Sequence, residues 1–187
     1  MCLAACAAMA VSAQETPKLN EKNIDEVLKA LTVEEKSRLV VGVRMCDNQS
    51  AAGDVGYTRL IVPGAAGTTS MVERLGITPV VLADGPAGLR ISPRRENDGN
   101  TYYCTGFPVG VHMASTWNAD IVREVGEAMG NEVREYGVDV LLAPGVNMMR
   151  NPLCGRNFEY YSEDPLLAGK MAAAFINGVQ SNGVGTS

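Results

Sequence analysis

Polar side chains that can donate or accept hydrogen bonds follow two apolar stretches of the chain. Asp84 comes directly after residues 79–83, and Arg90 lies a few positions further on. Arg150 and Arg156 follow a second apolar stretch. A carboxylate can accept hydrogen bonds from two adjacent hydroxyls, while a guanidinium donates to hydroxyls or holds a carboxylate in place. These residue types predict a site for a hydroxyl-rich ligand.

Each of these residues also has a purely structural interpretation. Asp84 precedes a Gly-Pro pair, a combination that is typical of turns. Arg150 and Arg156 could instead pair with one of the carboxylates nearby, namely Glu159, Glu163 and Asp164. The residue types alone therefore leave both interpretations open.

The elements that must position these side chains can be predicted from hydrophobic periodicity. The apolar stretches, residues 79–83 and 138–143, suit strands that are buried on both faces, as in a parallel sheet. Residues 118–136 place apolar side chains on one face and charges on the other, which predicts a helix. Asp164 and Pro165 have the form of an N-cap and a first helical residue. Alternating strands and helices indicate a parallel α/β fold, whose ligands bind at the carboxyl ends of its strands.

The amino-terminal part of the chain predicts two further helices. Residues 24–31 form one helical stretch, and residues 32–35 (Thr-Val-Glu-Glu) have the form of a capping box. A helix should therefore begin after Thr32 and run to about Met45. Residues 46–76 are rich in Gly, Ala and Thr and predict a loop with one short helix.

Composition places the chain among ordinary soluble globular proteins. Of its 187 residues, 46% are hydrophobic and 20% charged, enough apolar material for a core in one domain. The net charge of −5 and the lack of a Lys/Arg cluster argue against nucleic acid and anionic membranes as partners. Residues 64–69 are a weak match to a phosphate-binding loop, because the lysine that such a loop needs is absent.

The first thirteen residues differ from the rest and predict export. Residues 1–13 carry no charge and end in Ser12 and Ala13, small residues that suit signal-peptidase cleavage. Residues 3–6 also have the form of a lipoprotein signal, in which Cys6 would carry the lipid. We therefore expect a bacterial periplasmic protein or an outer-membrane lipoprotein; a disordered Ala-rich tail is the alternative. No other stretch has the length and apolar character of a membrane span.

The cysteines give no clear framework. Cys2 and Cys6 fall in the predicted leader, which leaves Cys46, Cys104 and Cys154. No Cys/His spacing typical of zinc is present. One disulfide and three free thiols remain equally open.

Four longer segments carry a resemblance to a known family. They are L-T-V-E-E-K (31–36), L-A-D-G-P-A-G-L-R (82–90), F-P-V-G-V-H-M-A-S-T-W-N (107–118) and P-G-V-N-M-M-R-N-P-L-C-G-R-N-F-E-Y-Y-S-E-D-P (144–165). They closely resemble family 3 glycoside hydrolases and occur in the order that the family has. The last segment is long enough to be specific.

The resemblance implies a fold and an activity. The fold would be a partial (β/α)8 TIM-type barrel, with residues 31–187 as its first few strand–helix units and residues 14–30 as a linker and first helix. The activity would be retaining hydrolysis of terminal β-D-glucosyl residues, although β-xylosidases and β-N-acetylhexosaminidases also occur in the family. No metal or organic cofactor is implied, since two carboxyl groups suffice for this chemistry.

The resemblance also implies roles for the polar residues. Asp84 and Arg156 match family residues that bind hydroxyls of the sugar at the cleavage site. Arg90 and Arg150 occupy matching positions and are expected to line or support the pocket. Glu159 is expected to partner an arginine, and His112 to be structural.

The catalytic carboxyl groups of the family would lie beyond Ser187. A retaining glycosidase needs a nucleophile and an acid/base, and neither matches a residue of this chain. We therefore expect this chain by itself to be inactive and poorly soluble. The alternative is a non-catalytic carbohydrate-binding or assembly module that ends at Ser187.

Overall fold

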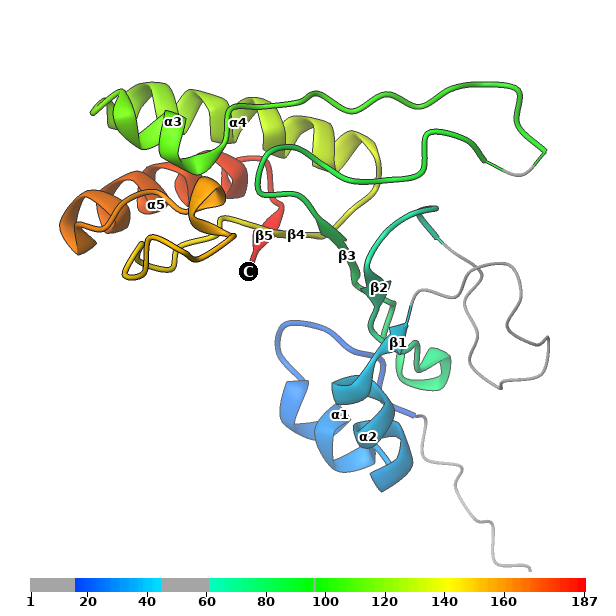
Figure 1. Cartoon of the computed structure of the whole chain (residues 1–187). Coiled ribbons are helices and arrows are strands. Elements are labelled where there is room, and N and C mark those ends of the chain that lie inside the picture. Colours follow the sequence, from blue (N-terminus) through cyan, green and yellow to red (C-terminus); the bar gives the residue numbers. More distant parts are fainter. Residues whose placement is uncertain (1–15, 45–60, 96) are drawn as a thin grey trace, which may run out of the picture.

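The computed structural model describes residues 16–44, 61–95 and 97–187 (Figure 1). The predicted leader, with Cys2 and Cys6, and also Cys46 lie outside the described residues. The elements in chain order are α1 (Ile24–Ala30), α2 (Val33–Val41), β1 (Val43–Arg44), β2 (Gly67–Thr68), η1 (Glu73–Leu75), β3 (Val81–Asp84), α3 (Gly110–Ser115), α4 (Ala119–Glu135), β4 (Val140–Leu142), η2 (Asn157–Glu159), α5 (Pro165–Gln180) and β5 (Gly185–Thr186).

The strands form one mixed sheet in the order β1-β2-β3-β4-β5. The β1–β2 and β2–β3 pairs are antiparallel, whereas β3–β4 and β4–β5 are parallel. In the parallel part Ala83 lies opposite Leu141, so Asp84 and Leu142 end their strands side by side. The loops that carry the predicted ligand-binding residues therefore leave the same edge of the sheet, as the sequence predicted.

The central strands are fully buried on one face only, which corrects the expectation of burial on both. Val81, Ala83 and Leu141 are buried in the main core, while Leu82 and Val140 on the other face are only half-buried. The reason is that α4 and α5 supply the apolar partners of the first face in the described residues, as Figure 1 shows above β3 to β5. The second face has no such helix layer in the described residues.

Helices α4 and α5 pack tightly side by side against the sheet. Both begin as predicted: the side chain of Asn118 caps α4, and Asp164 caps α5 with Pro165 in its first position. Their backbones approach closely where glycines face each other. A Cβ at Gly126 would lie 2.4 Å from the carbonyl oxygen of Phe175, so only glycine fits there without a shift of the helices.

Helices α1 and α2 and the short helix η1 share a second, smaller core. Val27, Leu31, Val72 and Leu75 are buried together there, with Leu75 fully so. The capping box at Thr32 and Glu35 is formed as predicted. Helix α2 is shorter than predicted, because Gly42 adopts the left-handed φ of +71° and ends it after Val41.

Residues 61–76, the described part of the predicted loop 46–76, contain more structure than predicted. The backbone amides of Ala66 and Thr69 donate to the carbonyls of Leu82 and Val80, at 2.8 and 3.0 Å. Since β2 thus pairs with β3, these amides are not free to hold a phosphate, and the phosphate-loop interpretation of residues 64–69 is wrong.

None of the described helices combines the length and apolar character needed to cross a bilayer. Cys104 and Cys154 do not form a disulfide with each other.

Candidate functional site

Asp84 and Arg90 come together at the carboxyl end of β3. Arg90 Nη1 lies 3.5 Å from Asp84 Oδ2, and the Arg90 backbone N–H donates to the Asp84 carbonyl at 2.9 Å. The Asp84 side chain is 50% exposed, so its carboxylate can still accept hydrogen bonds from a ligand. The turn between them agrees with Asp84 as a turn-forming residue. Its place at the end of the strand agrees with Asp84 as a ligand-binding residue.

The backbone of this turn leaves no room for a side chain at Gly88. Gly88 has a φ of +127°, and a Cβ there would lie 2.2 Å from the carbonyl oxygen of Thr105. Only glycine can bring the turn so close to residues 105–107. This close approach requires glycine at position 88 of the Gly-Pro-Ala-Gly-Leu stretch that separates Asp84 from Arg90.

Arg156 and Glu159 form a second pair on the loop after β4. Arg156 Nε donates to Glu159 Oε1, and this ion pair raises the pKa of Arg156. The Glu159 side chain is mostly buried at 12% exposure, whereas that of Arg156 is 69% exposed. Glu159 therefore holds the Nε edge of the guanidinium, and most of the Arg156 side chain stays exposed. The predicted pairing of Glu159 with an arginine is confirmed.

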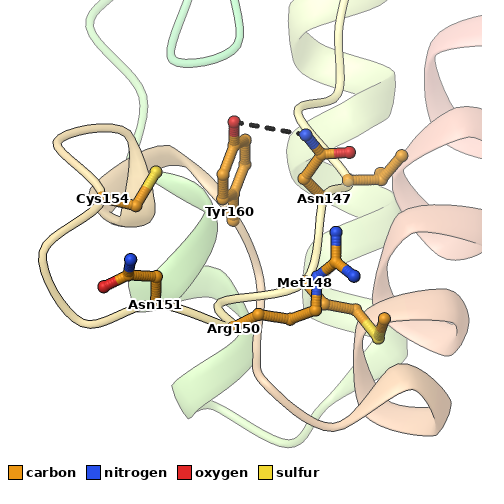
Figure 2. Close-up of a pocket in the computed structure, with 7 residues that line it drawn as sticks. Asn147, Met148, Arg150, Asn151, Cys154 and Tyr160 are labelled. Atoms are coloured by element: carbon orange, nitrogen blue, oxygen red, sulfur yellow. Dashed lines mark hydrogen bonds between the residues drawn. The ribbon is translucent and has the colours of Figure 1, made fainter.

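Arg150 lies in a pocket of about 370 Å³ in the same loop region. Figure 2 shows the amide of Asn147 turned toward the hydroxyl of Tyr160, with Asn147 Nδ2 3.5 Å from the Tyr160 oxygen. The residues lining the pocket are Val146, Asn147, Met148, Arg150, Asn151, Cys154 and Tyr160. With its amides, guanidinium and phenol, the pocket offers several hydrogen-bond donors to a polyhydroxylated ligand.

The four predicted residues thus fall into three groupings. Asp84 contacts Arg90, Arg156 contacts Glu159, and Arg150 lines the pocket with Asn147. No hydrogen bond or ion pair joins one grouping to another within residues 61–95 and 97–187. The pocket residues Asn151, Cys154 and Tyr160 were not predicted; their membership of the same motif as Arg150 and Arg156 was the available signal.

Neither His112 nor the acidic side chains of the described residues form a metal site. His112 is exposed on α3 and does not line the pocket. In the part of the chain that the structure describes, no three His, Cys, Asp or Glu side chains are grouped as metal ligands.

Comparison with known proteins gives one consistent family. The profile of the "Glycosyl hydrolase family 3 N terminal domain" matches residues 91–187. Thermostable beta-glucosidase B of Acetivibrio thermocellus is 40% identical over 168 residues, 87% of this chain and 19% of that protein. An exo-alpha-(1->6)-L-arabinopyranosidase of Bifidobacterium longum is 42% identical over 164 residues, 86% of this chain and 19% of that protein.

A solved structure agrees in both sequence and fold. Beta-glucosidase 3B of Thermotoga neapolitana, in complex with alpha-D-glucose, is 59% identical with a TM-score of 0.78. The match covers 88% of this chain and 22% of that one, so the chain spans about a fifth of the length of such relatives. Its sheet and helices are part of a (β/α)8-type barrel, as the sequence predicted. The chain therefore belongs to glycosyl hydrolase family 3.

Proposed function

We propose that the protein hydrolyses terminal β-D-glucosyl residues by a retaining mechanism, and that this segment supplies part of its sugar-binding pocket. The observation that carries the proposal is the Asp84–Arg90 pair at the carboxyl end of β3, beside the β4 loop that bears Arg150 and Arg156. The similarity to a glucose-bound beta-glucosidase supports a glucose-sized ligand.

The proposed roles follow from the hydrogen-bonding chemistry of each group. The exposed carboxylate of Asp84 would accept hydrogen bonds from two adjacent hydroxyls while Arg90 holds it in place. The donors of Arg156 that Glu159 does not hold would bind hydroxyls on the same sugar. Arg150 would line or support the pocket. The nucleophile and the acid/base, which must lie about 5–5.5 Å apart, would come from residues outside this segment.

The decisive experiment is Asp84→Asn in the full-length protein, assayed on an aryl β-D-glucoside. Asn keeps the shape but loses the charge and one acceptor, so kcat/KM should fall by about a hundredfold or more. Asp120→Asn is the matched control, since Asp120 is exposed in the first turn of α4. Parallel assays on aryl α-L-arabinopyranoside and β-D-xyloside test the substrate class.

Each outcome separates the candidate functions. Hydrolysis of the glucoside that D84N abolishes and D120N does not supports the proposal. Glucose binding without hydrolysis by the wild type would favour the carbohydrate-binding module instead. A wild-type protein that neither binds glucose nor hydrolyses the glucoside would contradict both candidate functions.

We also propose that the protein is exported, on the basis of the uncharged residues 1–13. Mass spectrometry of the mature amino terminus tests this. A start at Gln14 indicates a soluble exported protein, a lipid on Cys6 indicates an anchored one, and an intact Met1 contradicts export.

A further inference from the structure

The loop between β3 and α3 folds back along α4 before α3 begins. Residues 102–107, the return segment, run from Tyr102 to Phe107 and lie along α4 (Figure 1). The Tyr136 hydroxyl donates to the carbonyl of Tyr103 at 2.5 Å, and Tyr102 packs edge-on against the Tyr136 ring. This end of the return segment is thus attached to the carboxyl end of α4.

Glu132 attaches the other end of the return segment to α4. Its two carboxylate oxygens accept the Thr105 backbone N–H at 3.0 and 3.1 Å, and Oε2 also accepts the Thr105 hydroxyl at 2.7 Å. Hydrogen bonds to an ionised carboxylate are among the stronger ones in proteins. One charged side chain on the helix therefore fixes both the backbone and the side chain of Thr105.

Thr105 in turn lies directly against the turn that bears Asp84 and Arg90. Its carbonyl oxygen occupies the space where Gly88 would carry a Cβ, which would lie only 2.2 Å away. Next to it, the Phe107 N–H donates to the carbonyl of Ala87 at 2.9 Å. The turn cannot shift toward the return segment, and the Phe107–Ala87 hydrogen bond prevents it from moving away.

We propose that Glu132 is a positioning residue for the sugar-binding pair Asp84 and Arg90. It acts through Thr105 and the backbone of the turn, and it does not line the pocket. The link to sugar binding rests on the function proposed above. The effect of Glu132 on the position of the turn is argued from the contacts of Thr105 and Phe107 and can be measured without any ligand.

The test compares three substitutions on α4 in the full-length protein. Glu132→Ala removes the acceptor, and Glu132→Gln keeps one oxygen for the Thr105 N–H. Glu124→Ala is the matched control, because Glu124 is exposed on the same helix and its side chain makes no hydrogen bond within the described residues. Hydrogen exchange is followed in peptides that cover residues 84–92 and 102–107, and the inhibition constant for glucose and KM for an aryl β-glucoside are measured alongside.

E132A should exchange about tenfold faster in both peptides, while peptides from α5 stay unchanged. KM and the glucose inhibition constant should rise about tenfold with kcat reduced less, and E132Q should recover much of the loss. E124A should match the wild type in every measurement.

Two results would overturn the proposal. One is unchanged exchange at residues 84–92 in E132A; the other is equal effects of E132A and E124A, which would indicate a general loss of helix stability. If the wild type binds no sugar but E132A still speeds exchange at residues 84–92, the proposed function fails, and Glu132 positions the turn for another ligand.

Discussion

The two hydrophobic cores of the molecule are held together by different means. The main core, between the sheet and helices α4 and α5, contains fully buried large side chains such as Phe175, Met129 and Leu141. The amino-terminal core has four buried residues, and polar contacts supplement it. Arg74 of η1 donates to Glu35 at the start of α2 and, at 2.8 Å, to the carbonyl of Ala30 at the end of α1.

The difference shows how core size decides which interactions matter. Apolar burial contributes about 25 cal/mol per Å² and does not depend on pH, so the main core should respond to changes of shape rather than of charge. A small core buries little area, and charged contacts at its edge then form a larger share of its stability. The exposed apolar residues of α1 and α2 agree with a smaller buried face there: Ile24, Leu28, Val33, Val40 and Val41.

The largest expected effect is in the main core. Phe175→Ala should lower the free energy of unfolding by about 4 kcal/mol, because Phe175 on α5 is fully buried in the main core and its removal leaves a cavity. Urea denaturation followed by circular dichroism measures this. A loss below about 1 kcal/mol would contradict the packing of this core.

Leu75→Ala tests the amino-terminal core with a side chain that is equally buried. We expect a loss of about 2–3 kcal/mol, at the low end for such substitutions, because a four-residue cluster can close around the gap. Hydrogen exchange should rise in α1 and α2 and stay unchanged in α5. An equal rise in both regions would show that the two cores unfold as one unit.

Gly126→Ala tests the close approach of α4 and α5. The new methyl would lie 2.4 Å from the Phe175 carbonyl oxygen, so the helices must separate, at a cost of about 2 kcal/mol. Gly169→Ala on α5 is the control: nothing lies within 4 Å of its Cβ, and alanine should stabilise that helix by up to about 1 kcal/mol. Opposite signs for the two substitutions in thermal melts would confirm the close crossing.

The smallest effect concerns charge at the amino-terminal core. The hydrogen bonds from Arg74 and from the Thr32 backbone lower the pKa of Glu35 to about 2, from an ordinary value of 4.5. Because the pKa is lowered, the stabilisation of the folded state by ionised Glu35 is complete above pH 4.5 and is lost as the pH falls toward 2. The difference in Tm between wild type and Glu35→Gln should therefore shrink over that range.

Glu34→Gln controls for charge in the same first turn of α2, where Glu34 is exposed and, among the described residues, forms neither an ion pair nor a hydrogen bond with Arg74. A wild-type advantage over E35Q that stays constant from pH 7 to pH 2.5 would show that the Arg74–Glu35 contact does not stabilise this core.

Several parts of the fold and site could be read from the sequence because their causes are local. The capping box at Thr32 and the N-caps Asn118 and Asp164 each involve side chains within three residues of the backbone they cap. The pairing of Arg156 with Glu159 is likewise a contact over three residues. The long family-like segment 144–165 pointed to the region in which the pocket was found.

Other parts could not be predicted, because they depend on residues distant in the chain. Strands β1 and β2 have only two residues each and exist through pairing with a neighbour, so no periodicity marks them. The contact of Glu132 with Thr105 spans 27 positions, and no local pattern indicates it. Burial of β3 on one face depends on where α4 and α5 lie.

The sequence by itself determined the helix starts, the α/β class and the family to which the chain belongs, because caps, periodicity and long motifs are written in neighbouring residues. Only the tertiary structure decided that Asp84 faces Arg90, that Arg150 shares a pocket with Tyr160, and that Glu132 supports the turn after β3. The physical reason is that Glu132 and Thr105 lie on separate elements, while the other two contacts depend on how the loops after β3 and β4 fold against the rest of the molecule. Their distances are set by how the helices pack on the sheet, and the order of residues along the chain does not encode them directly.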